Sequence, residues 1–293
     1  MFMRLNDNFL GAALMTCCVL AYVLNDAVMK LLFLEIDFFQ AIFLRSLVSL
    51  PPLLILASRA KSLLQKYSKK NKRLIIIRIF AEIGTTVTFL TALKYMPLAN
   101  VTAIAQSLPL AITMAAALFL GERVGWRRWS AILIGFTGVL IIIRPGLAGF
   151  NSYSLVALAS VILLTIREIS TRKLDSEIPT ITVAFSTTLG ITVFAALPLI
   201  GSEWVEVHIT SWLLIIVAAA AITVATLLGI VAMRTGDISF VSPFRYTSLI
   251  GALGLGVLFF GEWPDGVTLL GAFIIVFSGF YSLHREHILS ASK

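Results

Sequence analysis

Leu118-Phe119-Leu120-Gly121-Glu122 returns 140 residues later as Leu258-Phe259-Phe260-Gly261-Glu262. Upstream, the same offset pairs Thr86 with Thr226, Ala92 with Ala232, Lys94 with Arg234 and Val101 with Val241. Downstream, an offset of 141 pairs Phe136 with Phe277, Gly138 with Gly279 and Arg144 with Arg285. One ancestral segment has therefore been duplicated, and we predict two domains, 1–146 and 147–293.

The composition indicates the class of protein. Hydrophobic residues make up 59% of the chain and charged residues 13%, with a mean hydropathy of +0.97, whereas soluble domains carry roughly 25% charged residues. A helix needs about 20 apolar residues to span a bilayer, where its backbone must be satisfied internally. We predict an all-α integral membrane protein with ten transmembrane helices, at 9–31, 38–57, 75–95, 101–119, 129–143, 154–173, 179–200, 212–233, 239–260 and 267–283.

Positive charges orient these predicted helices. If the N-terminus is cytoplasmic, the inner segments hold 16 lysines and arginines, and the outer ends hold only Lys30, Lys94 and Arg144. Lysine and arginine concentrate in cytoplasmic loops, so we expect both termini in the cytoplasm and the chain in the cytoplasmic (inner) membrane. Binding of nucleic acid or of specific lipids is an alternative role for the basic loops, but topology alone accounts for them.

The repeat and the predicted orientation agree. Each half holds five helices, an odd number, so the second half must be inverted relative to the first. Lys94 then lies outside and its repeat partner Arg234 inside. Internal symmetry of this kind is typical of secondary transporters, whose substrate site lies near the bilayer midplane between the inverted halves.

The first repeat carries a recognisable pattern of residues. The segment Ala92-Leu93-Lys94-Tyr95-Met96-Pro97 is followed by Ala99, Pro109, Gly121-Glu122, Gly135 and Gly138. This pattern resembles the EamA repeat of the drug/metabolite transporter superfamily. The second copy, from Ala232 to Gly279, matches less closely and has Leu249 in place of Pro109.

The resemblance has implications for fold and function. It covers essentially the whole chain, and implies ten helices in two inverted five-helix repeats with cytoplasmic termini. It also implies that the third, fourth, eighth and ninth helices wall a central cavity. Within the superfamily the chain is most similar overall to the exporters of amino acids and aromatic metabolites.

Ionisable side chains inside a membrane are costly and point to function. Arg78 and Glu82 lie one turn apart in the third predicted helix, and Arg245 lies at a similar depth in the ninth. They are interpreted as a gate or a clamp for a zwitterionic substrate, or alternatively as a structural salt bridge with Arg78 reaching the headgroups. The other candidates are interpreted as structural pairs: Asp26 with Arg45 on the outer side, and Arg167 with Glu168 on the inner side.

Polar residues at equivalent positions of the two repeats predict a substrate site. Pro109 removes a backbone donor and frees the carbonyl of Ala105. Helix–helix hydrogen bonds are the alternative role for these polar residues, and the threonines can instead bond to their own backbone. The predicted substrate-binding residues are Arg245, Tyr246, Thr247, Gln106, Ser107, Glu82, Thr86, Phe89 and Thr226.

Glu122 and Glu262 carry the repeat signature. The predicted topology places Glu122 at the cytoplasmic end of its helix and Glu262 at the outer end. A carboxylate at a helix C-terminus is unfavourable to the helix dipole, so each is expected to accept bonds from the N-terminus of the next helix or from a nearby arginine. We interpret both as structural or gating residues.

The sequence gives few signals for energy coupling. It contains no Gly-x-x-x-x-Gly-Lys-Ser/Thr loop, and its histidines, His208, His284 and His287, fall in a loop and in the tail. No cofactor or metal is expected. Because Arg78 lies beside Glu82, we expect Glu82 to stay charged, and transport to follow the substrate gradient without a proton gradient.

These features predict a secondary transporter that exports small amphipathic metabolites, most of all amino acids, including aromatic ones. We expect it to act as a monomer among membrane lipids, with no nucleic acid involved. A nucleotide-sugar carrier or another metabolite or drug carrier of the same fold is the main alternative. An intramembrane enzyme would need paired aspartates, a His/Ser set or a metal site, and a sensor would need a soluble output domain.

Overall fold

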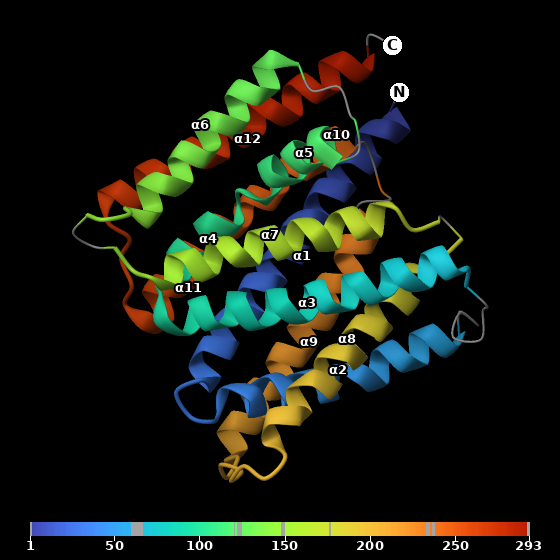
Figure 1. Ribbon diagram of the computed structural model, residues 1–293, viewed down its shortest axis with the longest axis vertical. Coiled ribbons are helices and arrows are strands. Elements are labelled where there is room, and N and C mark those ends of the chain that lie inside the picture. The colour runs from blue at the N-terminus through green and yellow to red at the C-terminus, as the bar shows by residue number, and fades with distance from the viewer. Residues whose placement is uncertain are drawn as a thin grey trace.

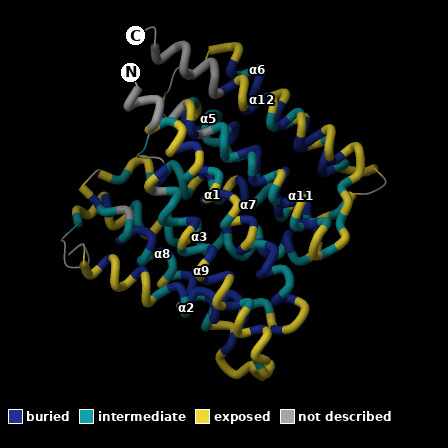
Figure 2. The backbone as a smooth tube through the Cα atoms, turned by 180° about the vertical axis from the view of Figure 1, so that it is seen from behind, coloured by how far each residue is buried: buried dark blue, intermediate teal, exposed yellow. Residues whose placement is uncertain are grey.

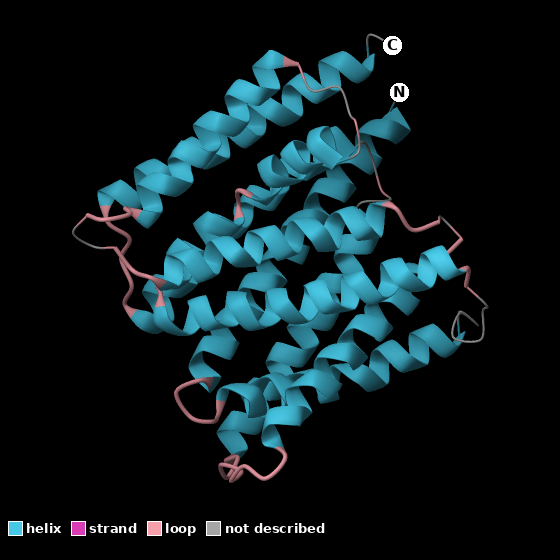
Figure 3. Cartoon of the chain, in the orientation of Figure 1, coloured by secondary structure: helices cyan, strands magenta, loops and turns pink. Residues whose placement is uncertain are grey.

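The computed structural model describes residues 2–59, 67–119, 121, 125–147, 150–175, 177–232, 235 and 238–291, and every regular element in these ranges is helical (Figure 3). The elements of residues 1–146 are α1 Phe2–Leu32, α2 Phe38–Arg59, α3 Lys69–Tyr95, α4 Leu98–Ala105, α5 Leu108–Phe119 and α6 Trp126–Ile143. Those of residues 147–293 are α7 Tyr153–Arg172, α8 Thr180–Ala196, η1 Leu197–Leu199, α9 Ile209–Ala232, α10 Ile238–Val241, η2 Ser242–Tyr246, α11 Thr247–Phe260 and α12 Gly266–Ala291.

The helices have the length and composition of membrane spans. Within the described ranges, nine helical stretches are long and apolar enough to cross a bilayer, and Gly266–Ser282 is a shorter apolar helix. Each of the ten segments expected from the sequence coincides with one of these stretches. The prediction of an all-α membrane protein is confirmed for this part of the chain.

Two of the ten stretches are interrupted, and they occupy equivalent positions in the two halves. α4 ends at Ala105 and α5 begins at Leu108, because Pro109 has no N–H to donate to the carbonyl of Ala105. In the second half, the short 3₁₀ segment η2 precedes α11, with Pro243 in its first turn. The sequence signalled the first interruption through Pro109 but predicted a continuous helix over 239–260.

The principal helix pairs each join one half of the chain to the other. α1 packs along α9, α3 along α7, α2 along α8 and α6 along α12. Both chain termini lie at one end of the molecule, called the terminal end here (Figure 1). The connections α1–α2, α3–α4, α6–α7, α8–α9 and α11–α12 lie at the other, called the opposite end.

The largest apolar core cluster gathers helix ends that lie toward the opposite end. It joins α1, α2, α3, α4, α8, α9 and α11, with Leu32, Leu93, Leu98, Ile215 and Ala252 fully buried in it. Figure 2 shows this interior as dark blue segments. A smaller cluster near the terminal end contains Met15, Val19, Ala232 and Val241. Among the described residues, apolar packing therefore closes the opposite end more extensively.

α6 and α12 form a tightly packed pair along one edge of the molecule (Figure 1). A Cβ atom added at Gly138 would lie 2.8 Å from the carbonyl oxygen of Gly271, and one added at Gly271 would lie 2.7 Å from that of Gly138. These distances are too short for any side chain. The two glycines therefore allow the backbones to approach directly, as small residues commonly do in membrane helices.

Candidate functional site

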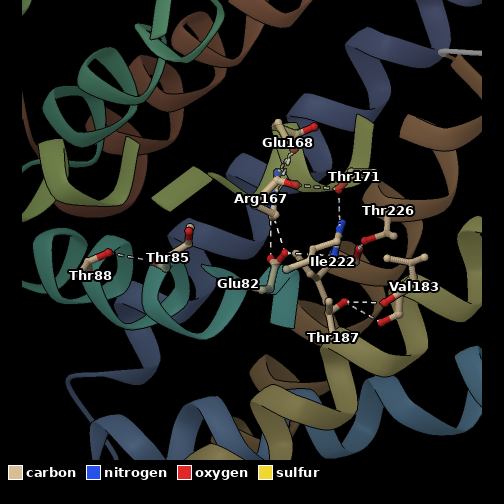
Figure 4. Close-up of polar contacts among 12 residues, drawn as sticks. Glu82, Thr85, Thr88, Arg167, Glu168, Thr171, Val183, Thr187, Ile222 and Thr226 are labelled. Carbon is tan, nitrogen blue, oxygen red and sulfur yellow. Dashed lines mark hydrogen bonds and ion pairs between the residues drawn. The ribbon is translucent and has the colours of Figure 1, made fainter. Parts of the chain in front are cut away.

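Four ionised side chains of α3 and α7 form a cluster between the two halves of the chain (Figure 4). Glu82 receives hydrogen bonds from Nη1 of Arg167, at 3.1 Å to Oε1 and 3.3 Å to Oε2. Arg78 lies 3.6 Å from the same carboxylate, one helical turn away along α3. Arg167 also donates to Oε1 of its neighbour Glu168, at 2.6 and 3.1 Å. Glu82 thus has two arginine partners, one from each half.

Further contacts fix the cluster in place while leaving each charged side chain partly exposed. Nε of Arg78 donates to Oγ1 of Thr171 at 2.7 Å, and Thr171 donates to the backbone oxygen of Arg167 at 2.8 Å. The four charged side chains remain 16–31% exposed although α3 and α7 pack closely on each other. Ionisable residues within membrane-spanning helices are rare and commonly mark a substrate or ion pathway.

The sequence-based pairing of Glu82 with Arg245 differs from the structure. Arg167 is the cross-helix partner of Glu82, so Arg167 and Glu168 belong to the same cluster as Arg78 and Glu82 instead of forming a separate structural pair. The alternative of a salt bridge that joins the two halves agrees with these contacts. Sequence alone could not show which helices α3 would face.

α1 carries a second group of polar residues. Asn25 connects the predicted pair Asp26 and Arg45, because its Nδ2 donates to Asp26 at 2.9 Å while its Oδ1 accepts from Arg45 at 3.3 Å. Tyr22, one turn before Asp26, interacts with Arg167, Glu82 and Thr226. Asp26 and Arg45 are therefore linked through an amide and make no direct ion pair.

Arg245 lies in η2, at the interruption before α11. Nε2 of Gln106 donates to the backbone oxygen of Arg245 at 3.1 Å and also bonds to the hydroxyl of Ser248. The two helix interruptions are therefore tied together, as expected if Gln106 forms a helix–helix hydrogen bond. The guanidinium of Arg245 makes no hydrogen bond or ion pair with any described residue, yet it interacts electrostatically with Glu168 and Cys18.

Several predicted substrate-binding residues lie in helix contacts. Tyr246 is 5% exposed, stacks on Phe280 and presses its hydroxyl against Gly279 of α12. Ser107 is fully buried and donates to the carbonyl of Ile104, and Thr247 donates to that of Phe244.

The remaining predicted residues of α3 and α9 divide between two environments. Thr86, one turn after Glu82 on α3, lines an apolar recess with side chains of α2 and α8. Phe89 packs between the two largest core clusters. Thr226 donates to the carbonyl of Ile222 at 2.8 Å and lies beside Tyr22. Thr226 is thus connected to the charged cluster through Tyr22, which interacts with Arg167 and Glu82.

Glu262 connects α1 and α4 to the end of α11 at the opposite end. Its Oε1 lies 2.5 Å from Nζ of Lys30, and its Oε2 accepts from the backbone N–H of Leu98 at 2.8 Å. Lys30 also donates to the backbone oxygen of Met96 at 2.7 Å. A helix N-terminus does bind this carboxylate, as expected, but it belongs to α4 and the cation is a lysine. Glu122 lies outside the described residues.

Sequence reasoning missed several residues that the structure brings into contact with predicted ones, among them Thr171, Ser248, Tyr22 and Lys30. Tyr22 and Lys30 lie one turn before and one turn after Asp26 on α1. The spacing of four residues places all three on one face of the helix. A polar stripe on an otherwise apolar helix was the signal that could have found them.

Replacing Arg167 is expected to destabilise the protein because both Glu82 and Glu168 lose a cationic partner. Breaking a fully buried pair costs roughly 3–5 kcal/mol, and screening of these partly exposed groups reduces the expected cost of Arg167→Gln to about 2 kcal/mol. Thermal unfolding in detergent measures the effect. Lys173→Gln, at an exposed position after the same helix, should change stability by less than about 0.5 kcal/mol; equal unfolding of both variants would contradict the prediction.

The chain is similar in sequence to transporters of known substrates. The chain is 25% identical to an S-adenosylmethionine uptake transporter of Rickettsia bellii, over 69% of each chain. It is 33% identical to a riboflavin transporter of Vibrio cholerae, over 69% of this chain and 68% of the relative. It is 27% identical to a pseudopaline exporter of Pseudomonas aeruginosa, over 81% and 83%.

A solved structure shares the fold over nearly the whole chain. It superposes with a TM-score of 0.60 and 20% identity, covering 98% of both chains. The sequence profile of the EamA-like transporter family matches residues 9–144 and matches again over 151–283. This chain therefore belongs to the EamA-like transporter family.

Proposed function

We propose that this protein exports small amphipathic metabolites, most of all amino acids, across the cytoplasmic membrane by alternating access. Family membership makes it a membrane transporter of small molecules and not an enzyme. The observation that carries the finer proposal is the guanidinium of Arg245, which has no hydrogen-bond or ion-pair partner among the described residues. It lies at a helix interruption, within electrostatic reach of Glu168 in the charged cluster. Interrupted helices in corresponding halves are a strong pointer to a transporter's binding site.

The helix contacts support two inverted repeats, 1–146 and 147–293, as the moving units. The repeat relates α1 to α7, α2 to α8, α3 to α9 and α6 to α12. If each helix is replaced by its repeat equivalent, the contact between α1 and α9 becomes the contact between α7 and α3, which the structure also contains. The contacts between α2 and α8 and between α6 and α12 are unchanged by the same replacement. A pseudo-two-fold axis in the membrane plane accounts for this pattern, and rocking of one half against the other would move the central site between the two sides.

We assign the terminal end to the cytoplasm and the described conformation to an inward-facing state. The excess of inner lysine and arginine supports the orientation. The large apolar cluster around Leu32, Leu93 and Ile215, with the contacts of Lys30 and Glu262, supports closure of the outer side. Substrate would then reach Arg245 and the charged cluster from the cytoplasm.

The charge of the site favours a substrate with a carboxylate. Three arginines, Arg78, Arg167 and Arg245, face two glutamates, Glu82 and Glu168. The excess cation is Arg245, whose planar fork can bind a carboxylate bidentately. The relatives bear names that span S-adenosylmethionine, which is an amino acid, and riboflavin, which has no carboxylate. Riboflavin is therefore the informative rival substrate.

Transport by the purified protein in proteoliposomes tests the proposal. We expect counterflow of L-phenylalanine or L-leucine down its own gradient, with no imposed pH gradient, because Glu82 is paired with two arginines, Arg78 and Arg167. S-adenosylmethionine and riboflavin serve as comparison substrates. Transport of riboflavin alone would replace the amino-acid assignment, and accumulation driven by a proton gradient and abolished by Glu82→Gln would make Glu82 a proton carrier.

The proposed topology is expected to be visible by cysteine labelling. A cysteine at Ser68, in the α2–α3 connection, should react with an impermeant maleimide only from the cytoplasmic side. A cysteine at Ser202, in the α8–α9 connection, should react from outside. Cys17 and Cys18 are the only native cysteines, and variants that lack them supply the background. Labelling of the Ser68 position in intact cells would overturn the orientation.

A further inference from the structure

Glu168 has one oxygen free for a ligand. Both hydrogen bonds from Arg167 go to Oε1, and Oε2 has no hydrogen-bond partner among the described residues. The side chain is 31% exposed, so neighbouring protein atoms do not enclose it completely. In Figure 4 the carboxyl group of Glu168 points away from the Arg167–Glu82 contact.

Arg245 presents the complementary charge. Gln106 holds its backbone oxygen from the opposite half of the chain, which fixes the start of the side chain. Glu168 and Arg245 are close enough to interact electrostatically, yet they do not form an ion pair. The guanidinium of Arg245 and Oε2 of Glu168 thus lie within electrostatic reach of each other, and both lack a hydrogen-bond partner among the described residues. A zwitterion carries one charge for each of them.

Glu82 is less suited to this role. Arg167 contacts both of its oxygens and Arg78 lies next to Oε2. A substrate cation would have to displace two arginines from Glu82 but none from Oε2 of Glu168. The residue expected from sequence to bind the substrate's cation is therefore occupied, and its neighbour in the cluster is available.

We propose that Arg245 and Glu168 form a two-point site for the α-amino-acid group, with the carboxylate on Arg245 and the ammonium on Oε2 of Glu168. Arg167 acts as a positioning residue, because it holds Oε1 and keeps the carboxylate from turning toward Arg245. Tyr22, which is 37% exposed beside Arg167 and Thr226, offers an aromatic surface to the substrate side chain. The inference rests on the proposed transport function and adds a requirement for both charges of the zwitterion.

The test compares matched solutes in proteoliposomes of the full chain. The probes are L-phenylalanine, 3-phenylpropanoate without the ammonium, and L-phenylalaninamide without the carboxylate, with the corresponding leucine series. A hydrogen bond to a charged group contributes on the order of a tenfold to hundredfold factor. We expect L-phenylalanine or L-leucine to be transported at least about tenfold faster than either analogue. We expect Glu168→Gln to remove the preference for L-phenylalanine over 3-phenylpropanoate, measured as the ratio of the two rates in the variant.

Controls separate this role from a structural one. Glu168→Asp keeps the charge and should retain part of the preference, and Glu203→Gln, at an exposed loop position, should retain all of it. Equal transport of amino acid and deaminated acid by the unmutated protein would overturn the two-point site even if Glu168→Gln failed to fold. Transport of riboflavin alone would overturn the two-point site but would still agree with transport of small metabolites. Transport of none of the probes would contradict both the two-point site and the proposed function.

Discussion

Arg245→Leu is expected to slow transport of amino acids on the order of a hundredfold, and Arg245→Lys about tenfold, without unfolding the protein. The leucine variant loses the charge and both donors of a bidentate contact, whereas lysine keeps a point charge and loses the fork geometry. Each 1.4 kcal/mol corresponds to a factor of ten, and a hydrogen bond to a charged group contributes about 1.5–3 kcal/mol. Initial rates in proteoliposomes measure the effect.

The stability of these variants is an essential part of that result. The guanidinium has no partner among the described residues, and Gln106 bonds to the backbone of Arg245 instead. Removal of the side chain therefore leaves no charged group newly unpaired, in contrast to the expected effect of Arg167→Gln. Equal transport of an amino acid and its amide by the unmutated protein, or unfolding of Arg245→Lys, would assign Arg245 a structural role.

The fold was largely predictable because its signals are local. Ten apolar segments follow from composition alone, and Pro109 predicts one helix interruption because proline lacks the donor that a helix needs at that position. The second interruption was missed. Pro243 lies in the first turn of η2, where proline is also compatible with an ordinary helix start, so its presence did not show that the helix would break.

The site was predicted less well because it depends on which helices meet. Arg78 and Glu82 could be paired from their spacing within one helix. The contact of Glu82 with Arg167 crosses 85 residues and has no local signal. Gln106 and Tyr246 align in the repeat, but Gln106 bonds across the interface while Tyr246 packs against α12. Pseudo-symmetry of sequence did not carry over to the roles of these side chains.

Within the described ranges, two ion pairs join the halves at the opposite end, and they connect different helices. Lys30 and Glu262 connect α1, α4 and the end of α11, around the large apolar cluster. Arg144 and Asp265 connect α6 with α12, which already approach backbone to backbone. The hydrogen bonds from Arg144 lower the pKa of Asp265 to about 2. Since this pKa is depressed, the pairing contributes stability above the unfolded value of about 3.9 and loses it only as pH falls through about 2.

Loss of the first pair is expected to open the outer side, and loss of the second is not. Ala252 is fully buried in the large apolar cluster, so a cysteine there reports opening from outside. In a background without Cys17 and Cys18, Glu262→Gln should speed labelling of this position by an impermeant maleimide about tenfold or more. The variant removes the charged contacts that favour the closed state, and each 1.4 kcal/mol of differential stability shifts such an equilibrium tenfold.

Asp265→Asn is the matched control for that experiment, because it removes an equally charged link from the α6–α12 edge without loosening the cluster around Ala252. It should leave the labelling rate within about twofold of the unmutated protein. Lys30→Gln should reproduce the effect of Glu262→Gln, since both residues belong to one contact. Slow labelling in both of those variants would show that apolar packing alone keeps the outer side closed. Labelling of Asp265→Asn as fast as that of Glu262→Gln would show that loss of either ion pair opens the outer side, and Glu262 would then have no special role.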